Sequence, residues 1–210
     1  MGGPPQLWLV QAGEYPLDPA AVALLSPDEV RRRGRFAHET DRHCYSVAHV
    51  VLHQLAGAYL RQDPAEVSIV RQPCKRCGRP DGRPALHRPD LHFSLSHSED
   101  LVLYAFARTP VGVDVEAMPA RGTVDELWAT LHPVERAELA ALLPAERDDA
   151  FLRCWTRKEA CLKGMGAGLT HGIEQPYVGS SKAPEAVDRW SLSDVEVPAE
   201  YRAAVAVSTL

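Results

Sequence analysis

The feature that most constrains the fold is a pair of segments that carry acidic residues on regular secondary structure. In residues 111–116 valine alternates with glycine, aspartate and glutamate, and this period of two predicts a β-strand. Asp114 and Glu116 then lie on one face, about 6.6 Å apart. Further along, Glu159 and Lys163 are four residues apart in a segment that predicts a helix, so they share one helix face. The chain must therefore accommodate acids on two rigid elements.

These acids can bind a metal ion if the strand and the helix meet. Three carboxylates suit a hard divalent cation such as Mg²⁺, so Asp114, Glu116 and Glu159 are the candidate ligands. Lysines beside the helix acid can neutralise phosphates that the metal bridges. The alternatives are an edge strand with solvent-facing acids and an ordinary surface pair of Glu159 with Lys163. The combination of the two segments favours phosphate chemistry.

Composition excludes several classes of protein. The apolar fraction of 45% and charged fraction of 24% are those of a globular protein, and a net charge of −5 argues against broad attraction to nucleic acid or anionic lipid. No run approaches the roughly 18 apolar residues of a membrane span, and the start lacks a basic signal-peptide region. Five cysteines are an odd number, which favours a reduced, cytoplasmic setting over a disulfide framework.

The remaining pattern predicts an α+β fold rather than regular βαβ alternation. The strongest helical period runs over residues 41–60, and a break at Arg108-Thr109-Pro110 precedes the acidic strand. Further helices are predicted over 124–131, 133–143 and 148–163, and strands over 6–10, 91–95, 101–107, 187–197 and 201–208.

Two other motifs have more than one interpretation. Cys74 and Cys77 have the spacing of half a zinc site, but no second such pair exists, so structural zinc and free thiols both remain open. Ser96 and His97 lie at a predicted strand end, where they can satisfy backbone donors or bind phosphate. The chain has no Gly-x-Ser-x-Gly elbow and no phosphate-binding P-loop motif, which argues against serine hydrolases and P-loop enzymes.

Taken together, the motifs resemble those of 4'-phosphopantetheinyl transferases of the surfactin-synthetase-activating (Sfp) type. The two main motifs are Gly112-Val113-Asp114-Val115-Glu116 and Trp155-Thr156-Arg157-Lys158-Glu159-Ala160-Cys161-Leu162-Lys163, the latter followed by Gly166-Ala167-Gly168-Leu169. Weaker matches are Phe93-Ser94-Leu95-Ser96-His97-Ser98, Gly82-Arg83-Pro84, and Arg35-Phe36 with Asp41-Arg42. The resemblance covers most of the chain, in order.

The resemblance implies an enzyme that transfers the phosphopantetheine arm of coenzyme A to a serine of an apo acyl, peptidyl or aryl carrier protein. Adenosine 3',5'-bisphosphate is the implied second product, and Mg²⁺ the implied cofactor. The implied fold has two similar α+β halves related by a pseudo-twofold, with the active site in the cleft between them. Residues 1–109 would form the half that binds the adenine and 3'-phosphate, and residues 110–210 the half with the catalytic acids. A monomer suffices for this arrangement.

The resemblance also assigns individual residues. The implied metal ligands are Asp114, Glu116 and Glu159, and the implied catalytic residues are Glu159, Lys163 and Glu135. The implied coenzyme A contacts are Arg35, Arg42, Arg83, Ser96, His97, Lys158 and Lys163. The chain departs from the family at Glu29 and Cys44, where basic residues are expected.

Two competing functions stay open at this point. The same acids would suit a Mg²⁺-dependent hydrolase of nucleotides or of the coenzyme A pyrophosphate. A non-catalytic module that binds coenzyme A, or that docks a partner through a Cys74/Cys77 zinc loop, is the other.

Overall fold

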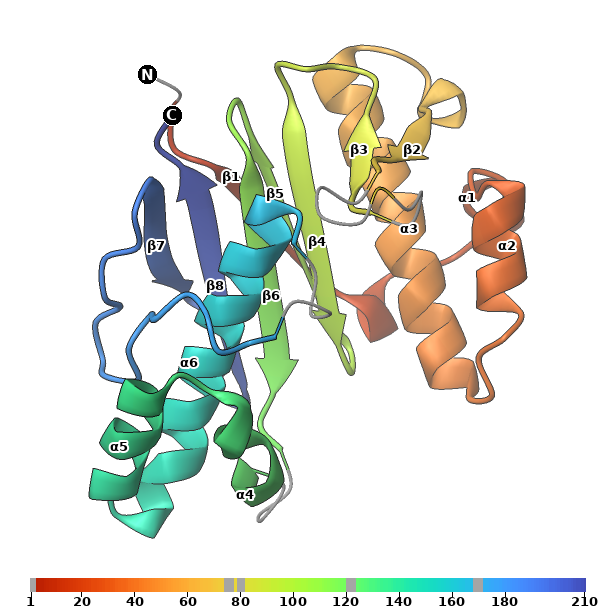
Figure 1. The fold of residues 1–210 in the computed structure, drawn as a ribbon. Helices are drawn as coiled ribbons and strands as arrows, with labels where there is room; N and C mark the ends of the chain where they lie inside the picture. The colour runs from red at the N-terminus through yellow and green to blue at the C-terminus, as the bar shows by residue number, and fades with distance from the viewer. Residues whose placement is uncertain (1–2, 74–77, 79–81, 120–123, 168–171) are drawn as a thin grey trace.

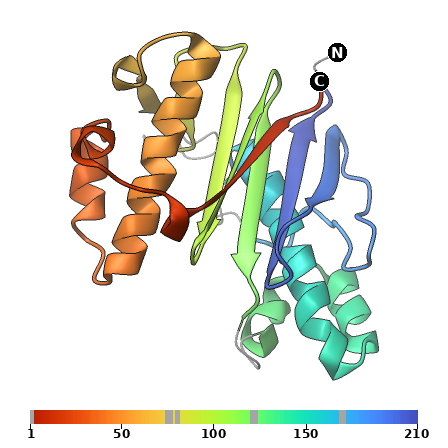
Figure 2. The same ribbon diagram turned by 180° about the vertical axis from the view of Figure 1, so that it is seen from behind.

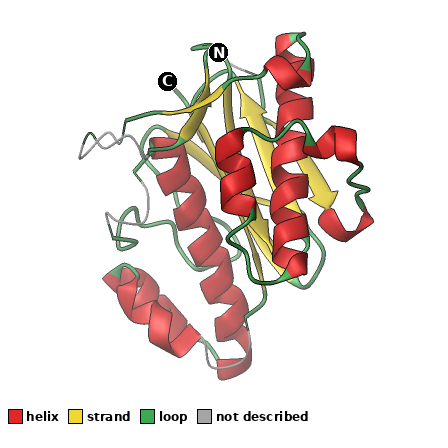
Figure 3. Ribbon diagram, turned by 90° about the vertical axis from the view of Figure 1, so that its right-hand side faces the viewer, coloured by secondary structure: helices red, strands yellow, loops and turns green. Residues whose placement is uncertain are grey.

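Two antiparallel sheets, each with one long helix, make up most of the molecule (Figure 1). The computed structural model describes residues 3–73, 78, 82–119, 124–167 and 172–210. Strands of the two sheets run side by side through the middle, and the long helices lie at either side (Figure 2). Seen from one side, helices stand in front of the strands (Figure 3). The arrangement confirms the α+β class.

The first sheet has the order β1-β5-β4, and its helices lie between β1 and β4 in the chain. Its strands are β1 (Gln6–Gln11), β4 (His92–Ser98) and β5 (Leu101–Ala107), and β4 and β5 pair as an antiparallel hairpin. The helices are α1 (Pro19–Val22), α2 (Pro27–Arg33) and the 22-residue α3 (Glu39–Leu60). A two-stranded sheet pairs β2 (Ile69–Arg71) with β3 (Pro84–Leu86), and 3-10 turns span Ala12–Glu14 and Pro64–Glu66.

The second sheet has the order β6-β8-β7. Its strands are β6 (Val111–Ala117), β7 (Trp190–Val195) and β8 (Tyr201–Ser208). The helices are α4 (Val124–Leu127), α5 (Pro133–Ala141) and the 22-residue α6 (Pro144–Met165), with a 3-10 turn over Trp128–Thr130. Each sheet thus has three strands and one 22-residue helix. The division at residue 109 and the pseudo-twofold relation stay predictions.

Helix α2 is held against α3 by a buried carboxylate. Glu29 accepts hydrogen bonds from His49 Nδ1 at 2.8 Å and His53 Nε2 at 3.1 Å, and it also closes a capping box with Ser26. These contacts hold the pKa of Glu29 well below its usual range, although burial opposes them. At position 29, where the family resemblance leads us to expect a basic residue, this chain therefore has an acid that joins α2 to α3.

The period of two in β6 decides which side chains face which core. A shared core lies between the two sheets; it contains Leu101, Leu103, Ala105 and Ala107 of β5, Val111, Val113 and Val115 of β6, and Tyr201, Ala203 and Val205 of β8. The intervening residues of β6, which include Asp114 and Glu116, therefore lie on the opposite face. Separate cores lie under α3 and α6. None of the helices in the described residues is long and apolar enough to cross a membrane.

Helix α6 crosses β6 at unusually short range because both elements have glycine at the crossing. A Cβ atom on Gly112 would lie 2.0 Å from the Ala160 carbonyl oxygen and 2.3 Å from the Gly164 nitrogen. Only a residue without Cβ fits there. The helix ends soon after, where Gly166 adopts φ +71° and its N–H bonds the carbonyls of the last turn. The close crossing brings Glu159 next to Asp114.

We expect Gly112→Ala to lower the free energy of unfolding by about 3 kcal/mol or more, because a backbone carbonyl must move to admit the methyl group. Urea denaturation followed by circular dichroism measures the change. Gly3→Ala is the control, since a Cβ at Gly3 meets nothing within 4 Å. Equal stability of the two variants would show that α6 does not pack this closely on β6.

Candidate active site

Asp114 is the centre of the site and is almost completely buried. Its side chain is 2% exposed, and its Oδ1 accepts hydrogen bonds from Ser96 Oγ at 2.8 Å and Lys163 Nζ at 2.6 Å. The other oxygen, Oδ2, is buried and has no hydrogen-bond partner among the described residues. Burial raises the pKa of Asp114, and the ammonium of Lys163 opposes this rise. The site therefore contains a buried carboxylate oxygen that lacks a positive or donor partner.

Glu116 and Glu159 are close enough to Asp114 to perturb one another. Ser98 Oγ donates a hydrogen bond of 2.9 Å to Glu116 Oε2, and Glu159 on α6 is 7% exposed. Burial, with the neighbouring charges of Asp114 and Glu116, raises the pKa of Glu159 to about 7. Burial and the charge of Asp114 likewise raise the pKa of Glu116. Three negative charges in this space need a cation among them.

The three carboxylates are suitable ligands for a hard divalent cation. Their side chains are not arranged as a complete metal site. Among the described residues, no three His, Cys, Asp or Glu side chains are arranged to hold a metal ion as they stand. The ammonium of Lys163 contacts Asp114 instead. Carboxylate oxygens are nevertheless the donors that Mg²⁺ prefers, and Asp114 Oδ2 needs such a partner. The assignment of Asp114, Glu116 and Glu159 as ligands stays a prediction.

Lys158 and Glu135 form an ion pair in the interior rather than on a ligand-accessible surface. Lys158 Nζ lies 2.8 Å from Glu135 Oε2, and neither side chain is exposed. The ammonium also donates to the carbonyl oxygens of Glu174 at 3.0 Å and Pro176 at 2.6 Å. Glu135 in turn accepts from Val178 N at 2.9 Å. In this structure, the expected roles of Lys158 at a phosphate and of Glu135 in metal binding or catalysis lack support, because both groups are enclosed.

The residues predicted to bind coenzyme A through the N-terminal half do not converge on one point. Arg83 contacts the C-terminal half: its NH1 donates a hydrogen bond of 2.9 Å to the Gly164 carbonyl of α6. It also lines a cavity of about 240 Å³ beside β3 and β4. Arg42 instead pairs with Glu39 and donates to Phe36 O at 3.0 Å. Arg35 is exposed just beyond α2. Of these three arginines, only Arg83 has a hydrogen bond to the second half among the described residues.

Ser96 and His97 point to opposite faces of β4, as neighbouring strand residues must. Ser96 is buried and contacts both Asp114 and Lys163, so it belongs to the acid cluster. His97 is exposed on the face that carries Phe93 toward the core under α3. These two predicted coenzyme A contacts therefore lie in different surroundings. Cys74, Cys77, Gly168 and Leu169 lie outside the described residues.

Two residues that contact the acid-bearing strand were missed by sequence reasoning. Ser94 Oγ accepts a hydrogen bond from Val113 N at 3.1 Å, and Ser98 contacts both Glu116 and the backbone of Ala117. The available signal was the recurrence of serine at every second position of a predicted strand. That pattern shows a shared polar face but not its partner.

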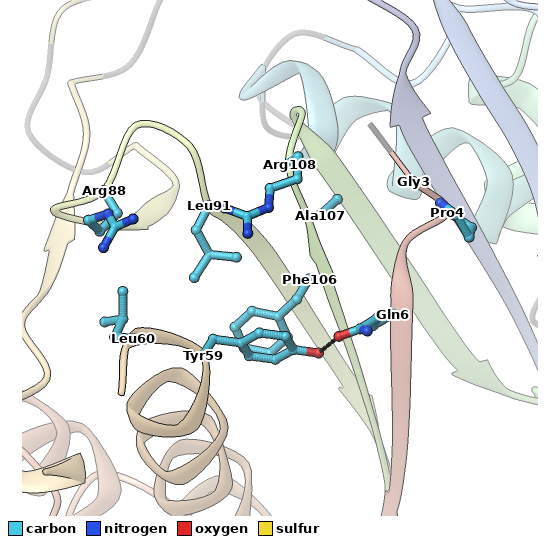
Figure 4. A pocket seen from close by; sticks show the side chains of 10 residues that line it. All are labelled: Gly3, Pro4, Gln6, Tyr59, Leu60, Arg88, Leu91, Phe106, Ala107 and Arg108. Carbon is cyan, nitrogen blue, oxygen red and sulfur yellow. Dashed lines mark hydrogen bonds between the residues drawn. The ribbon is translucent and has the colours of Figure 1, made fainter. Parts of the chain in front are cut away.

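Besides the cavity that Arg83 lines, two hollows among the described residues lie beside the sheets. An apolar cavity of about 220 Å³ lies beside Glu116, lined by residues of α4 and α6. A second hollow, of about 360 Å³, lies at the start of β4 and the end of β5, above stacked rings of Tyr59 and Phe106 (Figure 4). Arg88 and Arg108 at its rim both pair with Asp90. No carboxylate, imidazole or thiol lines this second hollow among the described residues, so it is not a candidate metal site.

We expect Glu159→Gln to stabilise the metal-free protein at pH 8 by about 2 kcal/mol, after allowance for screening by solvent. The folded-state pKa of about 7 exceeds the ordinary value of 4.5, so the folded state holds its proton more tightly. Stability from this group is therefore full below pH 4.5 and is lost as pH rises to about 7. Urea denaturation with a chelator at pH 5 and pH 8 measures the effect.

At pH 5 the gain should be much smaller, because wild-type Glu159 is then protonated when folded. Glu146→Gln, an exposed acid on the same helix, is the matched control and should change stability little at either pH. A loss of stability in Glu159→Gln at pH 8 would contradict the repulsion among the acids.

Lys158→Met should lower the free energy of unfolding by about 3–5 kcal/mol, because it leaves the buried carboxylate of Glu135 without its cation. The double variant with Glu135→Gln should recover part of this loss. A single variant as stable as wild type, but slower as an enzyme, would instead place Lys158 at a phosphate. Denaturation curves distinguish the two results.

Comparisons with known proteins show which family the chain belongs to. A model of the 4'-phosphopantetheinyl transferase superfamily matches residues 110–206, which include the three acids and Lys163. A 4'-phosphopantetheinyl transferase of Bacillus subtilis is 33% identical over 161 residues, which cover 77% of this chain and 67% of the relative. The 4'-phosphopantetheinyl transferase HetI of Nostoc sp. (strain PCC 7120) is 30% identical over 192 residues, covering 89% and 80%. The 4'-phosphopantetheinyl transferase Sfp of Bacillus subtilis (strain 168) is 27% identical over 150 residues, covering 71% and 63%. The chain therefore belongs to the 4'-phosphopantetheinyl transferase superfamily, in its Sfp type, and is a transferase.

Proposed function

We propose that the chain, as a monomer, transfers the 4'-phosphopantetheine arm of coenzyme A to a serine of an apo acyl, peptidyl or aryl carrier protein. The observation that carries the proposal is the buried Asp114, which lies beside Glu159 and Lys163 in a member of this family. Adenosine 3',5'-bisphosphate is the second product. The cytoplasm is the proposed setting.

The reaction exchanges one phosphorus–oxygen bond for another. The serine hydroxyl oxygen bonds to the phosphorus that carries pantetheine, the anhydride bond to the other phosphate breaks, and the serine proton passes to a base. Such reactions depend on alignment and charge neutralisation more than on a strong nucleophile. Mg²⁺, held by Asp114, Glu116 and Glu159, would supply charge neutralisation at the diphosphate.

Two residues of α6 have properties that suit a direct role in the transfer reaction. The Lys163 side chain is 32% exposed, so its ammonium can turn from Asp114 toward a phosphate that enters from solvent. Glu159, whose carboxylate lies beside these groups, is the proposed acceptor of the serine proton. Lys158 and Glu135 support the site indirectly, because their buried pair anchors α6.

The N-terminal half supplies the proposed contacts for the adenosine end of coenzyme A. Arg83 is the best supported of these, because it already bridges to α6 and lines a cavity. Arg35, Arg42 and His97 are proposed as contacts on the same side, with Ser96 closer to the acids. The apolar cavity beside Glu116 could receive the pantetheine arm.

Incubation with coenzyme A, Mg²⁺ and an apo carrier protein should add the mass of one phosphopantetheine to the carrier, as measured by mass spectrometry. Asp114→Asn should slow the transfer by about 100-fold or more, because charge stabilisation at the diphosphate is lost. Glu146→Gln, which removes an exposed acid of α6, should keep the wild-type rate.

The carriers should include fatty-acid, polyketide and nonribosomal peptide types. Wild-type protein that modifies none of them would contradict the proposal, and so would a fully active Asp114→Asn. Cleavage of coenzyme A without any carrier would instead indicate a hydrolase.

A further inference from the structure

The strands β4 and β6 lie side by side, yet each is an edge strand of its own sheet. Both run in the same direction in Figure 1. An edge strand leaves a row of backbone donors and acceptors that must find partners. The face of β4 toward β6 carries Ser94, Ser96 and Ser98, which we name the serine seam.

Hydroxyl oxygens of the serine seam accept hydrogen bonds from backbone N–H groups of β6. Ser94 Oγ accepts from Val113 N at 3.1 Å, and Ser98 Oγ accepts from Ala117 N at 3.0 Å. The two bonds have the same offset of 19 residues, so they belong to one parallel register. The seam therefore joins the two sheets through side chains.

Two seam residues also bond the acids of β6. Ser96 Oγ donates to Asp114 Oδ1 at 2.8 Å, and Ser98 Oγ donates to Glu116 Oε2 at 2.9 Å, both at an offset of 18 residues. Each bond occupies one oxygen of its carboxylate. The other oxygen of Asp114 is the buried Oδ2 without a partner.

We propose that Ser96 and Ser98 are positioning residues that orient Asp114 and Glu116 for a divalent cation. The inference rests on the proposed function, in which these acids hold Mg²⁺. A glutamate side chain has three rotatable bonds, and a fixed donor reduces the entropy lost when it binds a cation. Ser98 performs this role while its oxygen also holds the backbone of β6, so the acid and the strand are positioned together.

The seam provides a matched control within itself. Ser94 and Ser98 each accept one backbone N–H of β6, but only Ser98 also donates to an acid. Ser98→Ala and Ser94→Ala should therefore lose similar stability. The affinity for a divalent cation should fall about 10-fold or more in Ser98→Ala and change less than about twofold in Ser94→Ala.

The probe is Mn²⁺, titrated into the protein without coenzyme A or carrier and followed by the electron paramagnetic resonance signal of the free ion. Ser98→Thr, which keeps the hydroxyl group, should restore the affinity. Should Ser98→Ala fail to fold, Ser98→Cys fills the same space with a weak donor and should show the same loss.

The outcomes separate the inference from the proposed function. Equal affinities in Ser94→Ala and Ser98→Ala, with tight binding by the wild type, would overturn the positioning role and leave the proposed function standing. A wild-type protein that transfers phosphopantetheine but binds no Mn²⁺ would overturn the proposed metal ligands, and the positioning role with them.

Discussion

The contact between the buried carboxylate of Asp114 and the ammonium of Lys163 is the interaction on which the site depends. A carboxylate that is 2% exposed is costly unless donors or cations surround it. Lys163 and Ser96 supply two donors to one oxygen, from two different elements. Because the partners come from β4 and α6, the charge on β6 can be tolerated only when both halves are assembled. The contact between Asp114 and Lys163 therefore contributes both to the assembly of the two halves and to the charge distribution of the site.

The close crossing of α6 over β6 makes this contact possible, and buried charges hold the helix there. Gly112 removes the Cβ that would separate the two backbones. Arg157, fully buried, forms two hydrogen bonds with Asp194 of β7, and the neighbouring Lys158 is bound to Glu135. Consecutive positions of one helix thus serve different purposes: Arg157 and Lys158 anchor the helix, while the next residue faces the acids. Buried polar contacts of α6 therefore help to set the geometry of the site.

Electrostatics gives the site its properties as an enzyme. Burial raises the pKa of all three acids, and the charge of Asp114 raises those of Glu116 and Glu159 further. A cation between the strand and Glu159 would relieve this repulsion. The partly exposed Lys163 offers positive charge that can move toward an anionic substrate. The serine seam holds one oxygen of each strand acid. A diphosphate would thus meet groups that are already oriented, which lowers the cost of ordering them during the reaction.

The sequence by itself determined the secondary structure around the site and the presence of acids on both a strand and a helix. The period of two in β6 and the four-residue spacing in α6 show which residues share a face, because these periods follow from backbone geometry. Only the tertiary structure decided which faces meet. It placed Lys158 in the interior with Glu135, although its neighbours in sequence suggested a phosphate contact, and it set the serines of β4 against the acids of β6. A pattern describes one element at a time, whereas a partner from a distant part of the chain depends on how the elements pack.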